Sequence, residues 1–103
     1  MTKAEVIAEI AQKTGLEKAD VSTALEAFFT VVKNQLSTGE NIYVRGFGSF
    51  VVKRRAEKVG RIISKKQSIV IPEHSIPSFK PAKVFMEKVR TAPVGADNSG
   101  DMD

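Results

Sequence analysis

Residues 41–66 read NIYVRGFGSFVVKRRAEKVGRIISKK, and the character of the chain changes half-way along them. Apolar residues alternate with polar ones and glycines up to Val52, which is typical of a strand with one buried face. Residues 53–66 contain seven basic residues and one acid, Glu57, which gives this segment a net charge of +6. The seven are Lys53, Arg54, Arg55, Lys58, Arg61, Lys65 and Lys66. Because like charges repel, this segment predicts a polyanionic partner that supplies counter-charge.

A second strand-like stretch follows the basic segment. Ile69 and Ile71 alternate with polar residues, and nearby prolines confine this strand to a sheet edge or to irregular pieces, because proline donates no backbone hydrogen bond. These prolines are Pro72, Pro77 and Pro81. The two stretches predict a long hairpin, with an arm over about 53–76. Few arm residues are apolar, so neither face suits a core, and we expect the arm to order against a partner.

Helical periodicity surrounds these strands. Thr2 and Glu5 have the spacing of a capping box, and the helix that they begin ends at Thr14-Gly15. A longer periodic run extends from Val21 to Leu36 and ends at Ser37-Thr38-Gly39. Its apolar stripe, which includes Phe28 and Phe29, is wider than one short helix can cover, and this favours a dimer.

The C-terminal part predicts one short helix and a tail. Pro81 suits the first turn of a helix, and Val84, Phe85 and Val89 share one side of it. Residues 91–103 are polar and carry three aspartates, which predicts a disordered acidic tail. Gly46-Phe47-Gly48 predicts a tight turn in the preceding strand region.

Composition restricts the class of protein. The 103 residues, 42% of them apolar, suit one domain with a modest core, and the absence of cysteine excludes disulfides and thiolate metal sites. The first five residues carry charges where a secretory signal has its apolar stretch, and no run is long enough to span a bilayer. We therefore expect a soluble cytoplasmic protein without a membrane partner.

The residues for catalysis are missing. His74 is the single histidine, Ser49 lacks a partner motif for nucleophilic attack, and the carboxylates show no metal-ligand spacing. We expect no enzymatic activity, no cofactor and no metal.

Four ordered motifs resemble the signature of one family, the bacterial HU and integration host factor proteins. The resemblance covers roughly residues 1–90 without a gap. The motifs are Arg45-Gly46-Phe47-Gly48-Ser49-Phe50, Gly60-Arg61, Ile71-Pro72, and Pro77-Ser78-Phe79-Lys80-Pro81-Ala82-Lys83. Their combination in this order is far more specific than any one of them.

The resemblance implies an α+β fold and an architectural function. The expected fold is an intertwined dimer with a base of two N-terminal helices, a three-stranded antiparallel sheet extended into a β-hairpin arm, and a short C-terminal helix. Members of this family embrace duplex DNA in its minor groove and bend it, which implies a bacterial nucleoid protein with double-stranded DNA and a second copy of itself as partners.

The resemblance also implies roles for single residues. Those expected to face phosphate or groove are Lys3, Arg45, Lys53, Arg55, Lys58, Arg61, Lys80 and Lys83, and the charge run adds Arg54, Lys65 and Lys66. Phe47, Phe50 and Phe79 are expected at the dimer centre, beside the apolar stripe with Phe28 and Phe29.

The tip of the arm departs from the family. Arg61-Ile62-Ile63 stands where the family usually has Arg-Asn-Pro, so Ile63 takes the place of the proline that enters between bases. Neighbouring strand residues point to opposite faces, so Ile62 and Ile63 cannot both be wedges, and position favours Ile63. Without the fixed φ of proline, the angle of the bend stays open.

Other functions remain as alternatives. Arg45 matches the arginine of the sequence-preferring integration host factor β chain, but no base-reading cluster is visible, so we favour weak specificity. RNA is a possible partner because phosphate contacts distinguish it poorly from DNA. The rival from another class is an assembly protein whose arm binds an acidic surface; a membrane is disfavoured because the basic residues follow a strand pattern. Whether the dimer is homo- or heteromeric stays open.

Overall fold

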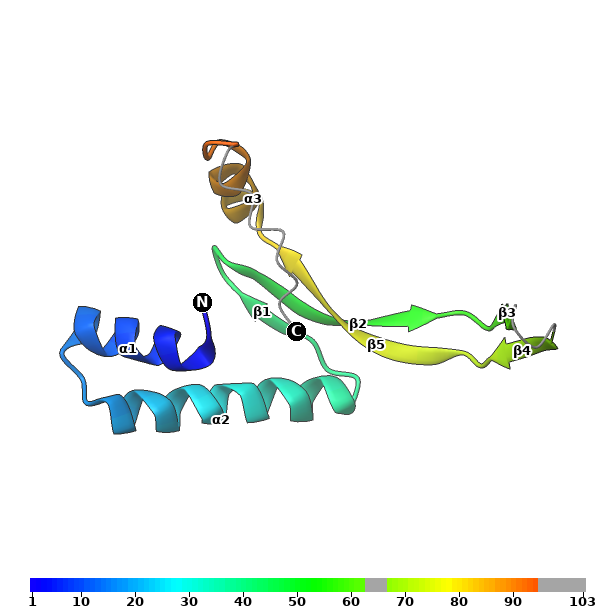
Figure 1. The fold of residues 1–103 in the computed structure, drawn as a ribbon, viewed down its shortest axis with the longest axis horizontal. Coiled ribbons are helices and arrows are strands. Elements are labelled where there is room, and N and C mark those ends of the chain that lie inside the picture. Colours follow the sequence, from blue (N-terminus) through cyan, green and yellow to red (C-terminus); the bar gives the residue numbers. More distant parts are fainter. Residues whose placement is uncertain (63–66, 95–103) are drawn as a thin grey trace.

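The computed structural model describes residues 1–62 and 67–94 and consists of helices at both ends of the chain with strands between them (Figure 1). The elements, in chain order, are α1 (Lys3–Thr14), α2 (Lys18–Ser37), β1 (Ile42–Val44), β2 (Gly48–Arg55), β3 (Lys58–Ile62), β4 (Gln67–Ile71), β5 (His74–Pro81) and α3 (Lys83–Arg90). This is the α+β arrangement expected from the sequence, with two N-terminal helices, a three-stranded sheet with a hairpin, and a short C-terminal helix.

The ends of α1 follow from local chemistry. The Glu5 backbone N–H donates to the Thr2 hydroxyl at 3.3 Å, and the Thr2 N–H donates to the Glu5 carboxylate at 3.2 Å, so the predicted capping box is confirmed. Hydrogen bonds from the Thr2 backbone and then its hydroxyl hold the pKa of the Glu5 carboxyl below its usual value. At the other end Gly15 adopts φ 76°, a left-handed conformation that glycine accepts without strain.

Helix α2 forms the floor of the molecule. It lies alongside α1, as Figure 1 shows, and also contacts β1 and β2. It ends at Ser37, where the predicted Ser37-Thr38-Gly39 boundary places it, and the Gly39 N–H donates to the Leu36 carbonyl at 3.1 Å. Helices α1 and α2 together form the helical base of the fold, on one side of the sheet (Figure 1).

The three-stranded sheet has the order β1-β2-β5, all antiparallel. The predicted tight turn between β1 and β2 is confirmed: Gly46 has φ 81°, and the Phe47 N–H donates to the Val44 carbonyl at 3.0 Å. The proline-rich β5 is an edge strand, as expected, since it pairs with β2 alone in this sheet. An edge strand tolerates proline, because the missing N–H can fall on its unpaired side.

The hairpin continues beyond this sheet as a second, two-stranded one. Strand β3 pairs with β4, and this pair extends away from the helices (Figure 1). Paired residue numbers add to 129 at Arg55 and His74 and again at Lys58 and Ile71, so the register is unchanged across the interruption. The predicted arm is thus confirmed, with a break of two residues in each strand that the sequence reasoning did not predict.

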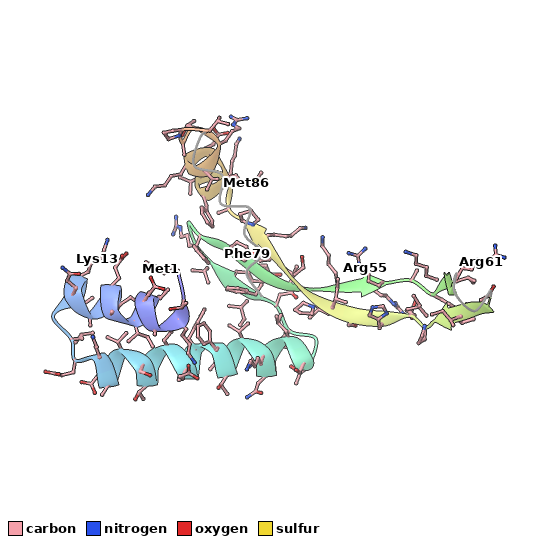
Figure 2. The ribbon with its side chains drawn as sticks, in the orientation of Figure 1. Met1, Lys13, Arg55, Arg61, Phe79 and Met86 are labelled. Carbon is pink, nitrogen blue, oxygen red and sulfur yellow. The ribbon has the colours of Figure 1, made fainter. Side chains whose placement is uncertain are left out.

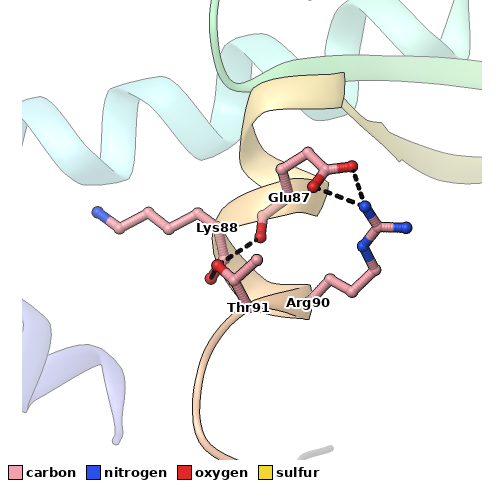
Figure 3. Close-up of polar contacts among 4 residues, drawn as sticks. All are labelled: Glu87, Lys88, Arg90 and Thr91. Atoms are coloured by element: carbon pink, nitrogen blue, oxygen red, sulfur yellow. Dashed lines mark hydrogen bonds and ion pairs between the residues drawn. The ribbon is translucent and has the colours of Figure 1, made fainter.

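Helix α3 begins later than predicted. Pro81 is the last residue of β5 and Ala82 is the N-cap, so the placement of Pro81 in the first helical turn was wrong. The Ala82 N–H donates to the Phe47 carbonyl at 2.8 Å, which keeps the chain extended for one residue past the strand. At the far end Arg90 binds both carboxylate oxygens of Glu87, at 2.6 and 2.7 Å, and the Thr91 hydroxyl donates to the Glu87 carbonyl at 2.9 Å (Figure 3).

The six phenylalanines of the chain form one connected cluster. Ring centroids of neighbouring members are 5.1 to 6.4 Å apart, and the nearest pairs join β2, β5 and the turn before β2. The members are Phe28, Phe29, Phe47, Phe50, Phe79 and Phe85. The structure therefore brings together all five phenylalanines expected at the dimer centre and adds Phe85 from α3.

This cluster is poorly covered by the rest of the chain. Phe28, Phe47 and Phe79 are 41%, 44% and 37% exposed, and Val21 is the one large apolar side chain that is buried among the described residues. A single copy thus leaves much of its apolar surface in water.

Candidate nucleic-acid interface

The hairpin has two faces that differ in chemistry. Directly opposite residues of an antiparallel pair share a face, and the face alternates along each strand. One face of β2 and β5 carries Phe50 opposite Phe79 and turns toward α2, where Phe50 lies 6.1 Å from the ring of Phe28. The other face, called the outer face below, carries Ser49 opposite Lys80.

Four of the predicted cations follow the outer face by register. Lys80 pairs with Ser49, Lys53 with Ile76, Arg55 with His74, and Arg61 with Ser68. Lys53, Arg55 and Arg61 are each an even number of residues from Ser49, so they share its face. All four side chains are exposed. Figure 2 shows Arg55 midway along the hairpin and Arg61 near its far end. The outer face therefore holds a row of positive charge from the sheet to the distal arm.

The remaining two described cations of the basic run are on the opposite face. Arg54 pairs with Ser75 and Lys58 with Ile71. Arg54 and Lys58 are an even number of residues from Phe50, so they are on the face that carries Phe50 and Phe79. Arg54 also donates from Nη2 to Glu73 Oε1 at 2.6 Å. Its charge is thus partly neutralised within the chain.

Ion pairing separates the cations further. Among residues 1–62 and 67–94 the ion pairs are Lys3–Glu26, at 2.5 Å, together with Arg54–Glu73 and Arg90–Glu87. The outer-face cations Lys53, Arg55, Arg61 and Lys80 have no acidic partner within this described part. None of these four charges is therefore neutralised by an ion pair in the described residues.

The base of the sheet adds a smaller cluster. Arg45 lies in the turn before β2, and with Tyr43, Ser49 and Lys80 it lines an open hollow of about 390 Å³. Lys83 is the first residue of α3, and Lys3 is the first residue of α1. The structure thus places Arg45 and Lys80 together and leaves Lys3 on the helical base, paired with Glu26.

Several predicted site residues lie outside the described residues. These are Ile63, the expected wedge, and Lys65 and Lys66 of the basic run. Ile62, the second choice for the wedge, is described as the last residue of β3, opposite Gln67. Most of the expected acidic tail, residues 95–103, is also outside the described residues.

Sequence reasoning missed the partner of Arg54 and the polar lining at the base. Glu73 was passed over because its position beside Arg54 depends on the hairpin register, which brings residues 19 positions apart together. Tyr43 was overlooked although it is the one tyrosine of the chain and alternates with Ile42 and Val44. That alternation is the signal that places Tyr43 opposite Ser49, on the outer face.

The family comparison agrees with this geometry. Residues 1–90 match the model of the family described as bacterial DNA-binding protein. The chain belongs to this family, that of HU and integration host factor. It is similar to the DNA-binding protein HU of Thermotoga maritima, with 39% identity over 90 residues that cover 87% of this chain and 100% of that protein. HU of Clostridium pasteurianum is 40% identical over 89 residues, 86% of this chain and 98% of its own length.

A solved structure shares the fold. The cocrystal structure of Anabaena HU with DNA superposes with a TM-score of 0.84 at 29% identity, covering 89% of this chain and all of that one. Proteins of the HU family are DNA-binding proteins and not enzymes, so family membership confirms the expectation that this protein has no enzymatic activity. In the described part of the chain no helix is long and apolar enough to cross a membrane, and no group of three or more acidic or histidine side chains suits a metal ion.

Proposed function

We propose that this protein is a dimeric architectural protein of the bacterial nucleoid that binds duplex DNA through the minor groove with weak sequence specificity and bends it. The observation that carries the proposal is the row of exposed cations without acidic partners on the outer face of the hairpin. The cocrystal of the Anabaena relative with DNA supports the choice of ligand.

The spacing of this row suits a nucleic-acid backbone. Lys53 and Arg61 are eight residues apart along one strand direction, which is about 26 Å at 3.3 Å per residue. That length spans several phosphates, so one hairpin can neutralise charges on both sides of a groove. Contacts of this kind hold the backbone and carry little sequence information, which favours weak specificity.

A titration with salt tests the proposal. The affinity for a duplex of random sequence is expected to fall linearly in log salt, with a slope of about 0.9 for each phosphate neutralised. A flat response would count against DNA binding. Competition with unlabelled duplex DNA, duplex RNA and single-stranded RNA of the same length decides between DNA and the RNA alternative, since a DNA architectural protein is displaced most strongly by duplex DNA.

The exposed apolar surface supports the proposed dimer. Phe79, Pro81, Phe85, Met86 and Val89 line an open hollow of about 430 Å³ between the end of β5 and α3. On α3, Val84, Met86 and Val89 are 64%, 56% and 62% exposed. A second copy of the chain would cover this hollow and complete the core that the phenylalanine cluster begins.

A single substitution tests the dimer. Val89→Glu is expected to convert a species of twice the 11.2 kDa chain mass into a monomer, because it places a charge where the second copy buries an apolar side chain. Analytical ultracentrifugation measures the mass. Lys13→Glu, a charge change at an exposed position of α1 away from this face, is the control and should keep the dimer. If Val89→Glu sediments as the wild type does, this face of α3 is not the interface.

The wedge is a separate proposal that rests on the family resemblance. Ile63→Ala is expected to reduce DNA bending while most of the affinity is kept, because a short side chain cannot enter a base step as isoleucine does. Energy transfer between dyes at the two ends of a short duplex measures the bend. Ile62→Ala is the matched control, and an unchanged bend with Ile63→Ala would exclude this residue as the wedge.

Arg45 supports a second candidate, a sequence-preferring subunit like integration host factor. Its position at the base, beside Lys80, suits a contact with DNA that flanks the bend. Competition between random and A-tract duplexes decides this point. A preference beyond about 4 kcal/mol would favour specific binding.

A further inference from the structure

The break in the hairpin separates it into two parts. The ladder of β2 and β5 ends at Arg55 and His74, and that of β3 and β4 begins at Lys58 and Ile71. Four residues between them have no ladder partner: Ala56, Glu57, Pro72 and Glu73. Pro72 explains part of the break because it has no N–H to donate. All four are exposed, so no core holds the two parts in one direction.

Two side-chain hydrogen bonds are made at this break, one between the two strands and one within the second strand. Arg54 Nη2 donates to Glu73 Oε1 at 2.6 Å, and His74 Nδ1 donates to the Pro72 carbonyl at 2.9 Å. The first links β2 to the break and the second holds the chain just before β5. Among the described residues, the Arg54–Glu73 pair is the one side-chain hydrogen bond that crosses from one strand to the other at this point.

Arg54 and Arg55 are neighbours with different surroundings. By register Arg55 is on the outer face with Lys53 and Arg61, whereas Arg54 is on the opposite face. Arg54 also has a carboxylate partner, whereas Arg55 has none in the described part of the chain. A duplex along the outer face would therefore meet Arg55 and not Arg54.

We propose that the unpaired residues 56–57 and 72–73 form a hinge between the root of the hairpin and its distal arm, and that the Arg54–Glu73 ion pair is a latch that sets the direction of the distal arm. Arg54 is then a positioning residue, and not a contact to DNA. The assignment of the outer face to DNA rests on the proposed function above, but the hinge and its latch do not.

An exposed ion pair adds little to folding stability, yet it suffices for this role. No other side-chain hydrogen bond crosses the break in the described part, so a small difference in free energy can change the population of arm directions. Because both charges are exposed, salt weakens the latch, and the distal arm should become more mobile as salt rises.

Spin labels test the hinge without DNA. The chain has no cysteine, so Ser68→Cys and Ser78→Cys place one label on the distal arm and one on the root, ten residues apart or about 33 Å. The doubly labelled chain is diluted in unlabelled protein, so that the measured distances lie within one chain. We expect a narrow distribution of distances that Arg54→Gln and Glu73→Gln both widen, and that Arg54→Lys largely keeps.

Glu57→Gln is the matched control, since it removes the other acid of the break, which has no ion-pair partner among the described residues. It should leave the distribution narrow. High salt should widen the wild-type distribution and change that of Arg54→Gln little. An equally narrow distribution in Arg54→Gln would overturn the latch.

The salt slope of duplex binding tests the role of Arg54 toward DNA. Arg55→Gln should reduce the slope by about 0.9 for each hairpin that contacts the duplex, whereas Arg54→Gln should leave the slope unchanged. An equal reduction in both variants would overturn the assignment of Arg54 as a positioning residue. A wild-type protein with no salt dependence would instead reject the proposed function, and the distance distributions would still decide the hinge.

Discussion

Replacing Lys53, Arg55 and Arg61 together by glutamine is expected to weaken binding to duplex DNA by about 500-fold at 0.1 M salt for each hairpin of the dimer that contacts the duplex. The three side chains are exposed and share the outer face of the hairpin, and none has an acidic partner among the described residues. Each phosphate contact contributes about 0.9 to the slope of log affinity against log salt, so the slope should fall by about 2.7 for each hairpin of the dimer that contacts the duplex. Fluorescence anisotropy of a labelled duplex measures both quantities.

A matched variant tests whether the loss of net charge alone produces this effect. Lys13, Lys33 and Lys88 are exposed lysines on α1, α2 and α3, and their triple glutamine variant loses the same charge. It should bind within a few-fold of the wild type, with nearly the same slope. Comparable losses in the two variants would show that the protein attracts DNA by its overall field, and not through the outer face.

The sequence predicted the elements whose signals are local. The Thr2–Glu5 capping box and the glycine after Thr14 predict the two ends of α1, and the structure confirms both. Each of these signals involves only a few neighbouring residues. The alternation of β2 likewise predicts which of its cations share a face, once the strand is recognised. Such features depend on neighbours in sequence and need no knowledge of the packing.

Features that depend on pairing between distant residues were harder to predict. Glu73 neutralises Arg54 only because the β2–β5 register brings them together. The run of seven cations was treated as uniform, whereas the structure divides its five described members between two faces. The break at Pro72 was missed for a related reason. A proline indicates an edge strand, but it interrupts the pairing only where the register turns its missing N–H toward the partner strand. Phe85 joined the aromatic cluster through α3, whose direction no local signal sets.

Gly48→Ala is expected to destabilise the folded protein by about 3 kcal/mol or to prevent folding. A Cβ at this position would lie 2.5 Å from the Lys80 carbonyl oxygen and 2.6 Å from the ring of Phe79. The first contact is with backbone of the paired strand, so relief requires β2 and β5 to separate exactly where the phenylalanine cluster joins the sheet. Chemical denaturation followed by circular dichroism measures the loss.

Gly60→Ala is the control in the same hairpin, and it separates close packing from a general cost of removing glycine. There a Cβ would meet Ile69 at 3.4 Å and Ile71 at 3.6 Å, contacts with side chains that can move. Its stability should stay within about 0.5 kcal/mol of the wild type, since alanine also lowers the entropy of the unfolded chain. Equal stability of the two variants would mean that β2 and β5 are not held as closely at Gly48 as the structure has them. A loss confined to Gly48→Ala would show that the root of the hairpin depends on that close approach, whereas the distal arm tolerates a side chain.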